Sequence, residues 1–196
     1  MFRLTKPTPA DIDRVIERYA RLNMQPELLS SRQGLRTPRL PAGFAHDLSR
    51  SRIGTGRRLF ESAVRSFEEW KPFDIGWVRV ANLGARIEVG QIVAVEVQAL
   101  GLRSLNLSQI VHVTRDAEAF GFIYKTTSHH AEEGEERFLL TRDPHTEEVH
   151  YELEAVSRPQ HWLAKIGYPV TRAFQHRFAR DSHQGLRNAV SASPLD

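Results

Sequence analysis

Residues 93–99 read Val-Ala-Val-Glu-Val-Gln-Ala, and this alternation decides the fold. A period of two places successive side chains on opposite faces of an extended strand, with one face against a core. The same period recurs along the chain at 107–114, 120–124, 138–140 and 149–155. With a short stretch at 77–80, these segments predict about six consecutive antiparallel strands. A further, polar strand is expected at 44–53, and Asp-Pro-His-Thr at 143–146 predicts a hairpin turn.

Helical patterns lie on both sides of these strands. A threonine cap, a proline and an acidic first turn predict a helix over 9–22. A second helix follows the Gly-Thr-Gly turn at 54–56 and ends at Pro72, because proline cannot continue a helix. An apolar stripe over 162–178 predicts a long C-terminal helix, with a kink or break at 167–169.

The order of these elements predicts an α+β fold of the helix-grip kind. A curved antiparallel sheet of about seven strands wraps around the long C-terminal helix in this arrangement. We expect residues 1–43 to form a helix and an arm packed on the domain, 44–190 to form the helix-grip domain, and 191–196 to be a frayed tail. A curled sheet that grips a helix leaves a place for small apolar molecules between them.

Composition sets limits on the class of protein. The chain has 196 residues, of which 40% are hydrophobic and 26% charged, as in an ordinary globular domain. It has no cysteine, which excludes disulfides, thiolate nucleophiles and cysteine metal sites. No signal-peptide core precedes the first helix, and no stretch approaches the roughly 18 apolar residues of a membrane span. We therefore expect a soluble cytoplasmic protein.

The charge pattern argues against nucleic acid as a partner. The formal net charge is only +3, and carboxylates are interspersed with the cations through most of the chain. One basic face does stand out on the predicted C-terminal helix. As one alternative, this face predicts an interaction module that presents an arginine-rich helix to an acidic partner. The face consists of Arg172, His176, Arg180, His183 and Arg187.

The densest polar cluster runs from His129 to Arg137, just after an aromatic strand. Imidazoles and carboxylates side by side can perform acid–base chemistry, but a solvated hairpin loop explains His130, Glu132 and Glu133 more simply. Glu135 and Glu136 point to opposite faces of a strand, so one of them points inward and needs a partner. Arg137 or Arg158 is expected to supply it. Adjacent histidines diverge and no metal-binding helical spacing is present, so no metal is predicted.

Three ordered blocks of the sequence together carry a resemblance to one known family. The first block is Arg52-Ile53-Gly54-Thr55-Gly56 with Phe60, Ala63 and Trp70. The second begins at Phe120-Gly121-Phe122-Ile123-Tyr124 and runs through Thr126, Thr127, His129 and Glu132 to Gly134-Glu135-Glu136-Arg137-Phe138. The third contains Ser157-Arg158-Pro159, Gly167-Tyr168-Pro169, Arg172, Gln175 and Arg177-Phe178.

Together the three blocks resemble the domain-of-unknown-function family number 1990. The resemblance covers about 44–186 and implies a Bet v 1-like, START-like helix-grip fold that favours apolar ligands. It implies no catalytic residues, and Lys125 stands where the family usually has glycine. We therefore predict a protein without a cofactor that binds a small apolar or amphipathic ligand. The predicted ligand-binding residues are Tyr124, His129, Glu135, Glu136, Arg137, Tyr151 and Arg158. A cyclase, isomerase or hydrolase with a Glu or His acid–base is the other alternative.

The aromatic residues of the strands have two interpretations that are compatible with each other. Phe120, Phe122, Tyr124 and Tyr151 either line a cavity or pack as core under the C-terminal helix. In a helix-grip fold with a partly hollow interior they do both. The opposite wall would then be closed by Trp162 and Phe174 of the C-terminal helix.

Overall fold

The computed structural model describes residues 2–3, 6–19, 29, 42–82, 84–99, 101–159 and 168–192. The elements in chain order are β1 (Phe2–Arg3), α1 (Pro9–Tyr19), β2 (Ala45–Thr55), α2 (Arg57–Glu68), the 3-10 turn η1 (Lys71–Phe73), β3 (Val78–Val80), β4 (Ile92–Ala99), β5 (Leu102–Arg115), β6 (Ala119–Thr126), β7 (Glu132–Arg142), β8 (Glu148–Pro159) and α4 (Tyr168–Ala192).

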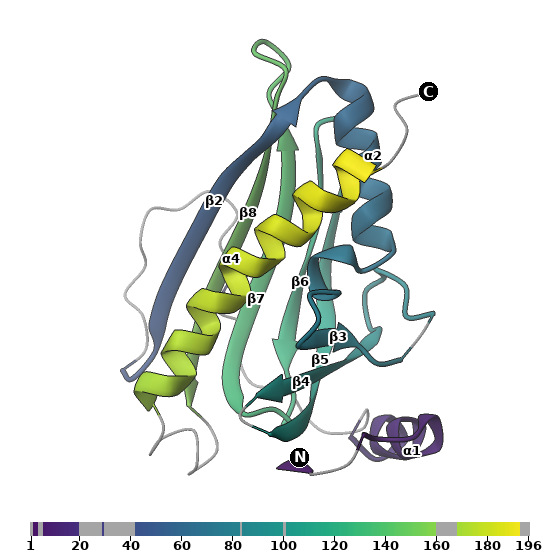
Figure 1. Ribbon diagram of the computed structural model, residues 1–196, viewed down its shortest axis with the longest axis vertical. Coiled ribbons are helices and arrows are strands. Elements are labelled where there is room, and N and C mark those ends of the chain that lie inside the picture. Colours follow the sequence, from purple (N-terminus) through teal and green to yellow (C-terminus); the bar gives the residue numbers. More distant parts are fainter. Residues whose placement is uncertain are drawn as a thin grey trace.

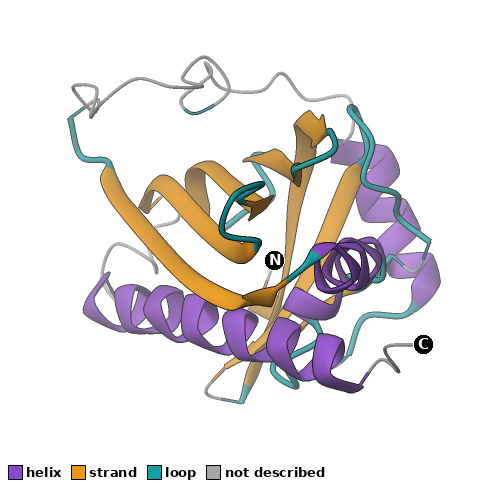
Figure 2. Cartoon of the chain, turned by 90° about the horizontal axis from the view of Figure 1, so that it is seen from above, coloured by secondary structure: helices purple, strands orange, loops and turns teal. Residues whose placement is uncertain are grey.

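The strands form one curled antiparallel sheet in the order β2-β8-β7-β6-β5-β4-β3, and β1 pairs with β5. The long helix α4 crosses the concave side of this sheet, with α2 beside its C-terminal half (Figure 1). Seen from above, α4 lies along the open side of the curled strands (Figure 2). The predicted helix-grip fold is confirmed, including the seven-stranded path.

The concave face of the sheet carries the main core. Phe122 and Phe138 face each other across β6 and β7 and stack with ring centroids 5.0 Å apart. Phe67 of α2 meets Tyr151 of β8 edge-on at 5.2 Å, and all four rings are buried. The predicted shared face of Phe120, Phe122 and Tyr124 is therefore confirmed, because the alternation in β6 turns these rings toward the helices.

A smaller cluster covers part of the convex face. Ile12 of α1 packs with Ala94 of β4 and with Leu105 and Leu107 of β5, and all four are buried. The predicted N-terminal helix thus packs on the sheet. Its described part ends at Tyr19, and most of the expected arm lies outside the described residues.

Other predicted boundaries hold with small shifts. The hairpin turn at 143–146 is confirmed: the Oδ1 atom of Asp143 accepts hydrogen bonds from the backbone N–H groups of His145 at 2.8 Å and Thr146 at 2.9 Å. The helix α4 begins at Tyr168, while the residues expected just before it lie outside the described part. It continues to Ala192, so the first two residues of the expected frayed tail are helical. Among the described residues, no helix is long and apolar enough to cross a membrane.

Candidate functional site

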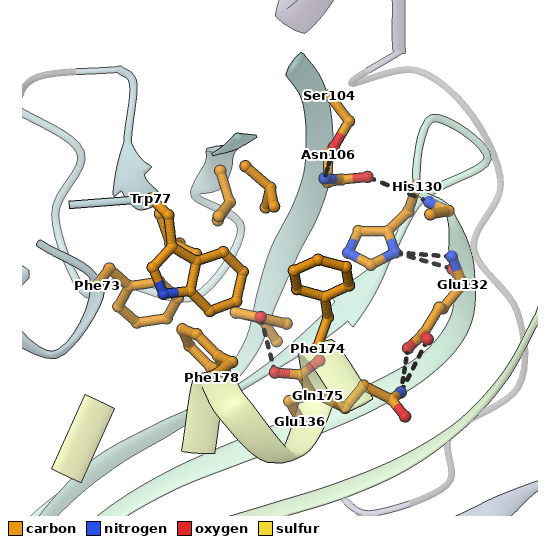
Figure 3. A pocket seen from close by; sticks show the side chains of 15 residues that line it. Phe73, Trp77, Ser104, Asn106, His130, Glu132, Glu136, Phe174, Gln175 and Phe178 are labelled. Atoms are coloured by element: carbon orange, nitrogen blue, oxygen red, sulfur yellow. Dashed lines mark hydrogen bonds between the residues drawn. The ribbon is translucent and has the colours of Figure 1, made fainter. Parts of the chain in front are cut away.

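A cavity of about 180 Å³ lies between the concave face of the sheet and α4. One side of it is aromatic, with rings from η1, the segment before β3, β6 and α4: Phe73, Trp77, Tyr124, Phe174 and Phe178. The other side is polar and comes from β5, the loop after β6, β7 and α4: Asn106, His130, Glu132, Glu136 and Gln175 (Figure 3). The cavity therefore has an apolar wall and a hydrogen-bonding wall.

Tyr124 and Glu136 form the central polar pair. They lie opposite each other in the β6–β7 register, and the Tyr124 hydroxyl donates to Glu136 Oε2 at 2.9 Å. Burial and, to a smaller extent, the neighbouring Glu132 raise the pKa of Glu136 from 4.5 to about 7, although the Tyr124 hydrogen bond lowers it. Burial also raises the pKa of Tyr124 well above its usual value. Glu136 can therefore gain or lose a proton near neutral pH, as a general acid or base must.

Glu132 is held by hydrogen bonds from two other elements. The Nε2 atom of Gln175 on α4 lies 2.8 and 2.7 Å from its two carboxylate oxygens, and Ser157 Oγ of β8 donates to Oε2 at 3.0 Å. Burial raises the pKa of Glu132, while the hydrogen bonds from Ser157 and Gln175 lower it. Gln175 thus joins α4 to the end of the sheet at the cavity wall.

His130 presents a neutral ring to the cavity. Its Nδ1 atom lies 3.0 Å from the backbone nitrogen of Glu132, a donor, and 3.1 Å from the backbone carbonyl oxygen of Glu132, an acceptor, so each tautomer of the ring finds a partner there. Burial lowers the pKa of His130 to about 4. The ring is therefore uncharged at neutral pH.

A second cavity of about 110 Å³ lies between β2, β8 and α4 and shares Glu136, Gln175 and Phe178 with the first. Asp47 lies on its wall and accepts a hydrogen bond from Arg172 Nη2 outside the lining at 2.6 Å, and this guanidinium lowers the pKa of Asp47. Glu136 therefore lies at the boundary between the two cavities. Among the described residues, no lysine or arginine lines either cavity.

Of the seven predicted ligand-binding residues, only Tyr124 and Glu136 line this cavity. Glu135 points to the convex face instead, where it is fully buried with Lys125; the Nζ and Oε1 atoms lie 3.4 Å apart. The backbone N–H of Leu29 also donates to this carboxylate. The inward carboxylate is Glu136, and its partner is Tyr124, so the expectation that Arg137 or Arg158 would supply that partner is wrong.

The remaining predicted residues make other contacts. Arg137 pairs on the convex face with Glu152 and Glu154, both at 2.6 Å, because it shares its face with Glu135. Arg158 pairs with Glu133 at 2.8 Å. Two aromatic rings complete the set. His129 lies against Tyr19 of α1 with centroids 4.4 Å apart, and the buried Tyr151 shares a hydrogen bond of 2.8 Å with Ser182.

His130 and Glu132 were assigned to a solvated loop, and the structure corrects this: both line the cavity. A signal for Glu132 was present in the sequence, because counting back in twos from Leu140 and Phe138 reaches Glu136, Gly134 and Glu132. His130 lies before the strand, where this count no longer applies. Among the described residues, no three His, Asp or Glu side chains gather as a metal site would require.

Comparison with known proteins gives a family and a fold. Residues 29–185 match the family model described as Domain of unknown function (DUF1990). A UPF0548 protein of Dictyostelium discoideum is 32% identical over 98% of this chain and 97% of its own length. A UPF0548 protein of Arabidopsis thaliana is 29% identical, over 77% of this chain and 76% of its own.

Two solved structures share the fold at low sequence identity. Ara h 8.0201 superposes with a TM-score of 0.50 and 13% identity, covering 77% of this chain and 100% of that one. A hypothetical protein from Helicobacter pylori gives a TM-score of 0.54 at 10% identity, over 80% of this chain and 96% of that one. These likenesses show a Bet v 1-like helix-grip fold.

Proposed function

We propose that this chain, which belongs to the family described as Domain of unknown function (DUF1990), binds a small amphipathic molecule between its sheet and α4. The observation that carries the proposal is the division of the cavity into an aromatic wall and a polar wall. Burial of an apolar group against the rings supplies affinity, and a few placed polar groups orient the ligand. The proposal keeps the cytoplasmic location that the sequence predicts.

The size of the cavity limits the ligand. A dry cavity of about 150 Å³ accommodates benzene, so the 180 Å³ present here suits a single ring with a short polar arm. Drug-sized ligands occupy about 300–1,000 Å³. A longer molecule would therefore have to place only its end here, or extend past Glu136 into the second cavity.

Two measurements test the proposal. Native and denaturing mass spectra of the freshly purified protein reveal any co-purified molecule as a mass that disappears on denaturation. Independently, 2-phenylethanol serves as a neutral one-ring probe, and its titration is followed by NMR shifts of Val97 and Ala131, which line the cavity. We expect saturable shifts at these residues and none at Val89, which is 68% exposed on the surface.

The decisive variant is one whose new side chain fills the cavity. Val97→Phe places a ring in the cavity and should abolish binding of 2-phenylethanol. Gln98→Phe is the matched control, because it adds the same ring to the same strand on the opposite, exposed side. Thermal unfolding of both variants checks that each is folded. Unchanged binding by a folded V97F protein contradicts the proposal.

Acid–base catalysis by Glu136 is the second candidate function. It is favoured by one observation: Glu136, half-buried in the cavity wall and hydrogen-bonded to Tyr124, has a pKa of about 7. The co-purified molecule identified by mass spectrometry would be incubated in D₂O with the wild-type protein and with the Glu136→Gln variant. Deuterium uptake or a new product only with the wild type supports an enzyme, and an unaltered ligand supports binding alone.

The arginine-rich helix receives less support as a docking surface. Two of its cations already meet carboxylates, because Arg172 pairs with Asp47 and Arg180 lies 3.2 Å from Asp181. His183 is buried, with hydrogen bonds to Ser49 and Ser51, and burial lowers its pKa to about 4. It is therefore uncharged at neutral pH and does not belong to the predicted basic face.

A further inference from the structure

We infer that the ligand of this cavity is an organic cation, a protonated amine attached through a short chain to an apolar ring. The inference rests on the proposed function and adds the chemical class of the ligand. It depends on three features: the charges around the cavity, the unfilled hydrogen-bonding capacity of Glu136 and the aromatic wall.

The charges around the two cavities are mostly negative. Three carboxyl groups face this region, from Asp47, Glu132 and Glu136, and among the described cations Arg172 is hydrogen-bonded to Asp47. A carboxylate or phosphate ligand would bring another negative charge into a poorly solvated site, at a high cost. A cationic ligand would instead compensate the charge that the protein leaves unbalanced.

Glu136 has room for such a partner, whereas Glu132 has little. Both oxygens of Glu132 already receive hydrogen bonds, from Gln175 and Ser157. Glu136 receives one bond, from Tyr124 to Oε2, and within the described part of the chain its Oε1 atom has no hydrogen-bond partner. An ionised carboxylate has about four acceptor positions. An ammonium group beside Glu136 would fill the vacant ones.

The aromatic wall is suited to the rest of such a ligand. Trp77 and Phe174 lie with ring centroids 5.7 Å apart, and Phe73 and Phe178 at 5.5 Å (Figure 3). Ring faces attract cations, and aromatic cages are a common way to bind substituted ammonium groups. The protein already uses Trp77 in this way, because the Arg177 guanidinium lies 4.7 Å from the centroid of its ring.

Binding of a cation should depend on pH with a defined sign. Burial raises the pKa of Glu136 to about 7, so a bound ammonium favours the ionised carboxylate and displaces a proton below that pH. Affinity should therefore rise about tenfold from pH 6 to pH 8, while an alkylamine stays protonated. Among the described residues, the titratable groups that face Glu136 come from β6, the loop after it, β7, β8, β2 and α4: Tyr124, His130, Glu132, Tyr151, Asp47 and His176.

The test compares three one-ring probes of similar size by calorimetric titration at pH 8: 2-phenylethylamine, 2-phenylethanol and 3-phenylpropionate. We expect the amine to bind at least about tenfold more tightly than the alcohol, and the acid more weakly than both. Glu136→Gln should remove most of the preference for the amine and its pH dependence. Glu133→Gln is the matched control, since it removes a carboxylate on the other face of β7 and should leave both unchanged.

Each other outcome decides against the inference. Equal binding of amine and alcohol, or tighter binding of the acid, overturns the cationic ligand and leaves the proposed cavity function standing. If none of the three probes binds, both the cationic ligand and the proposed binding function are contradicted. A preference for the amine that survives in a folded E136Q protein overturns the role of Glu136.

Discussion

Glu135 and Glu136 are neighbours on β7, yet their carboxyl groups lie on opposite faces of the sheet and have different partners. On the convex face Glu135 is fully buried and meets the ammonium group of Lys125 at 3.4 Å. On the concave face the hydrogen bond that Glu136 receives from the described residues comes from the neutral Tyr124 hydroxyl, and its pKa rises to about 7. Glu135 thus has a cationic partner within the protein, whereas Glu136 has a neutral hydrogen-bond donor that does not compensate its charge.

The difference indicates which carboxylate is structural. A buried charge needs compensation to be stable, and Lys125 provides it for Glu135. A carboxyl group whose pKa is strongly raised inside a cavity is often functional, as for Glu136 here. The contrast therefore assigns a packing role to Glu135 and a binding or catalytic role to Glu136.

The largest expected effect comes from breaking the convex pair. Lys125→Met leaves Glu135 buried without a cation and should lower the free energy of unfolding by about 3–5 kcal/mol. The double variant Lys125→Met with Glu135→Gln should recover much of this loss, because the amide oxygen still accepts from Leu29. Urea unfolding at pH 7 measures both. A single-variant loss below about 1 kcal/mol, as for an exposed ion pair, would show that the pair is not structural.

The next effect concerns Glu136 and pH. Its pKa is raised from 4.5 to about 7 in the folded protein, so its contribution to stability is complete below pH 4.5 and is lost as the pH rises through 7. Relative to Glu136→Gln, the wild type should therefore lose about 2–3 kcal/mol between pH 4.5 and pH 8. Urea unfolding across this range checks it. Glu133→Gln should show no such trend, and a flat difference for E136Q would refute the raised pKa.

The smallest expected effect concerns the hydrogen bond between Tyr124 and Glu136 on the concave face. Tyr124→Phe removes the donor that lowers the pKa of Glu136, so that pKa should move above 7. The cost in stability should be about 1 kcal/mol, the usual value of one hydrogen bond. Carbon-13 NMR titration of the Glu136 carboxyl measures the shift directly. A downward shift would mean that Tyr124 does not stabilise the ionised form.

Much of the fold could be predicted because its signals are local. Alternation in 120–124 placed Phe120, Phe122 and Tyr124 on the core side, and the Asp143 turn is visible in four residues. The site was predicted less well, although the alternation through Phe138 already implied that Glu136 faces inward and Glu135 outward. Selecting both glutamates ignored that signal.

Other features depend on contacts between distant residues. Gln175 reaches Glu132 across 43 positions in the chain, and Arg172 reaches Asp47 across 125. Neither pair has a spacing rule, because each depends on where α4 crosses the sheet. The same cause explains why His129 was predicted to bind the ligand while His130 lines the cavity. His129 packs against Tyr19, and this is a contact between distant segments.

By itself the sequence determined the strands, their inward and outward faces, and the long helix that they grip, because a period of two or of 3.6 residues is written into neighbouring residues. The tertiary structure alone decided which inward residues surround a cavity and which pack solidly. That choice depends on the register of β6 against β7 and on the position of α4, since burial and hydrogen bonding are properties of atoms brought together from different elements.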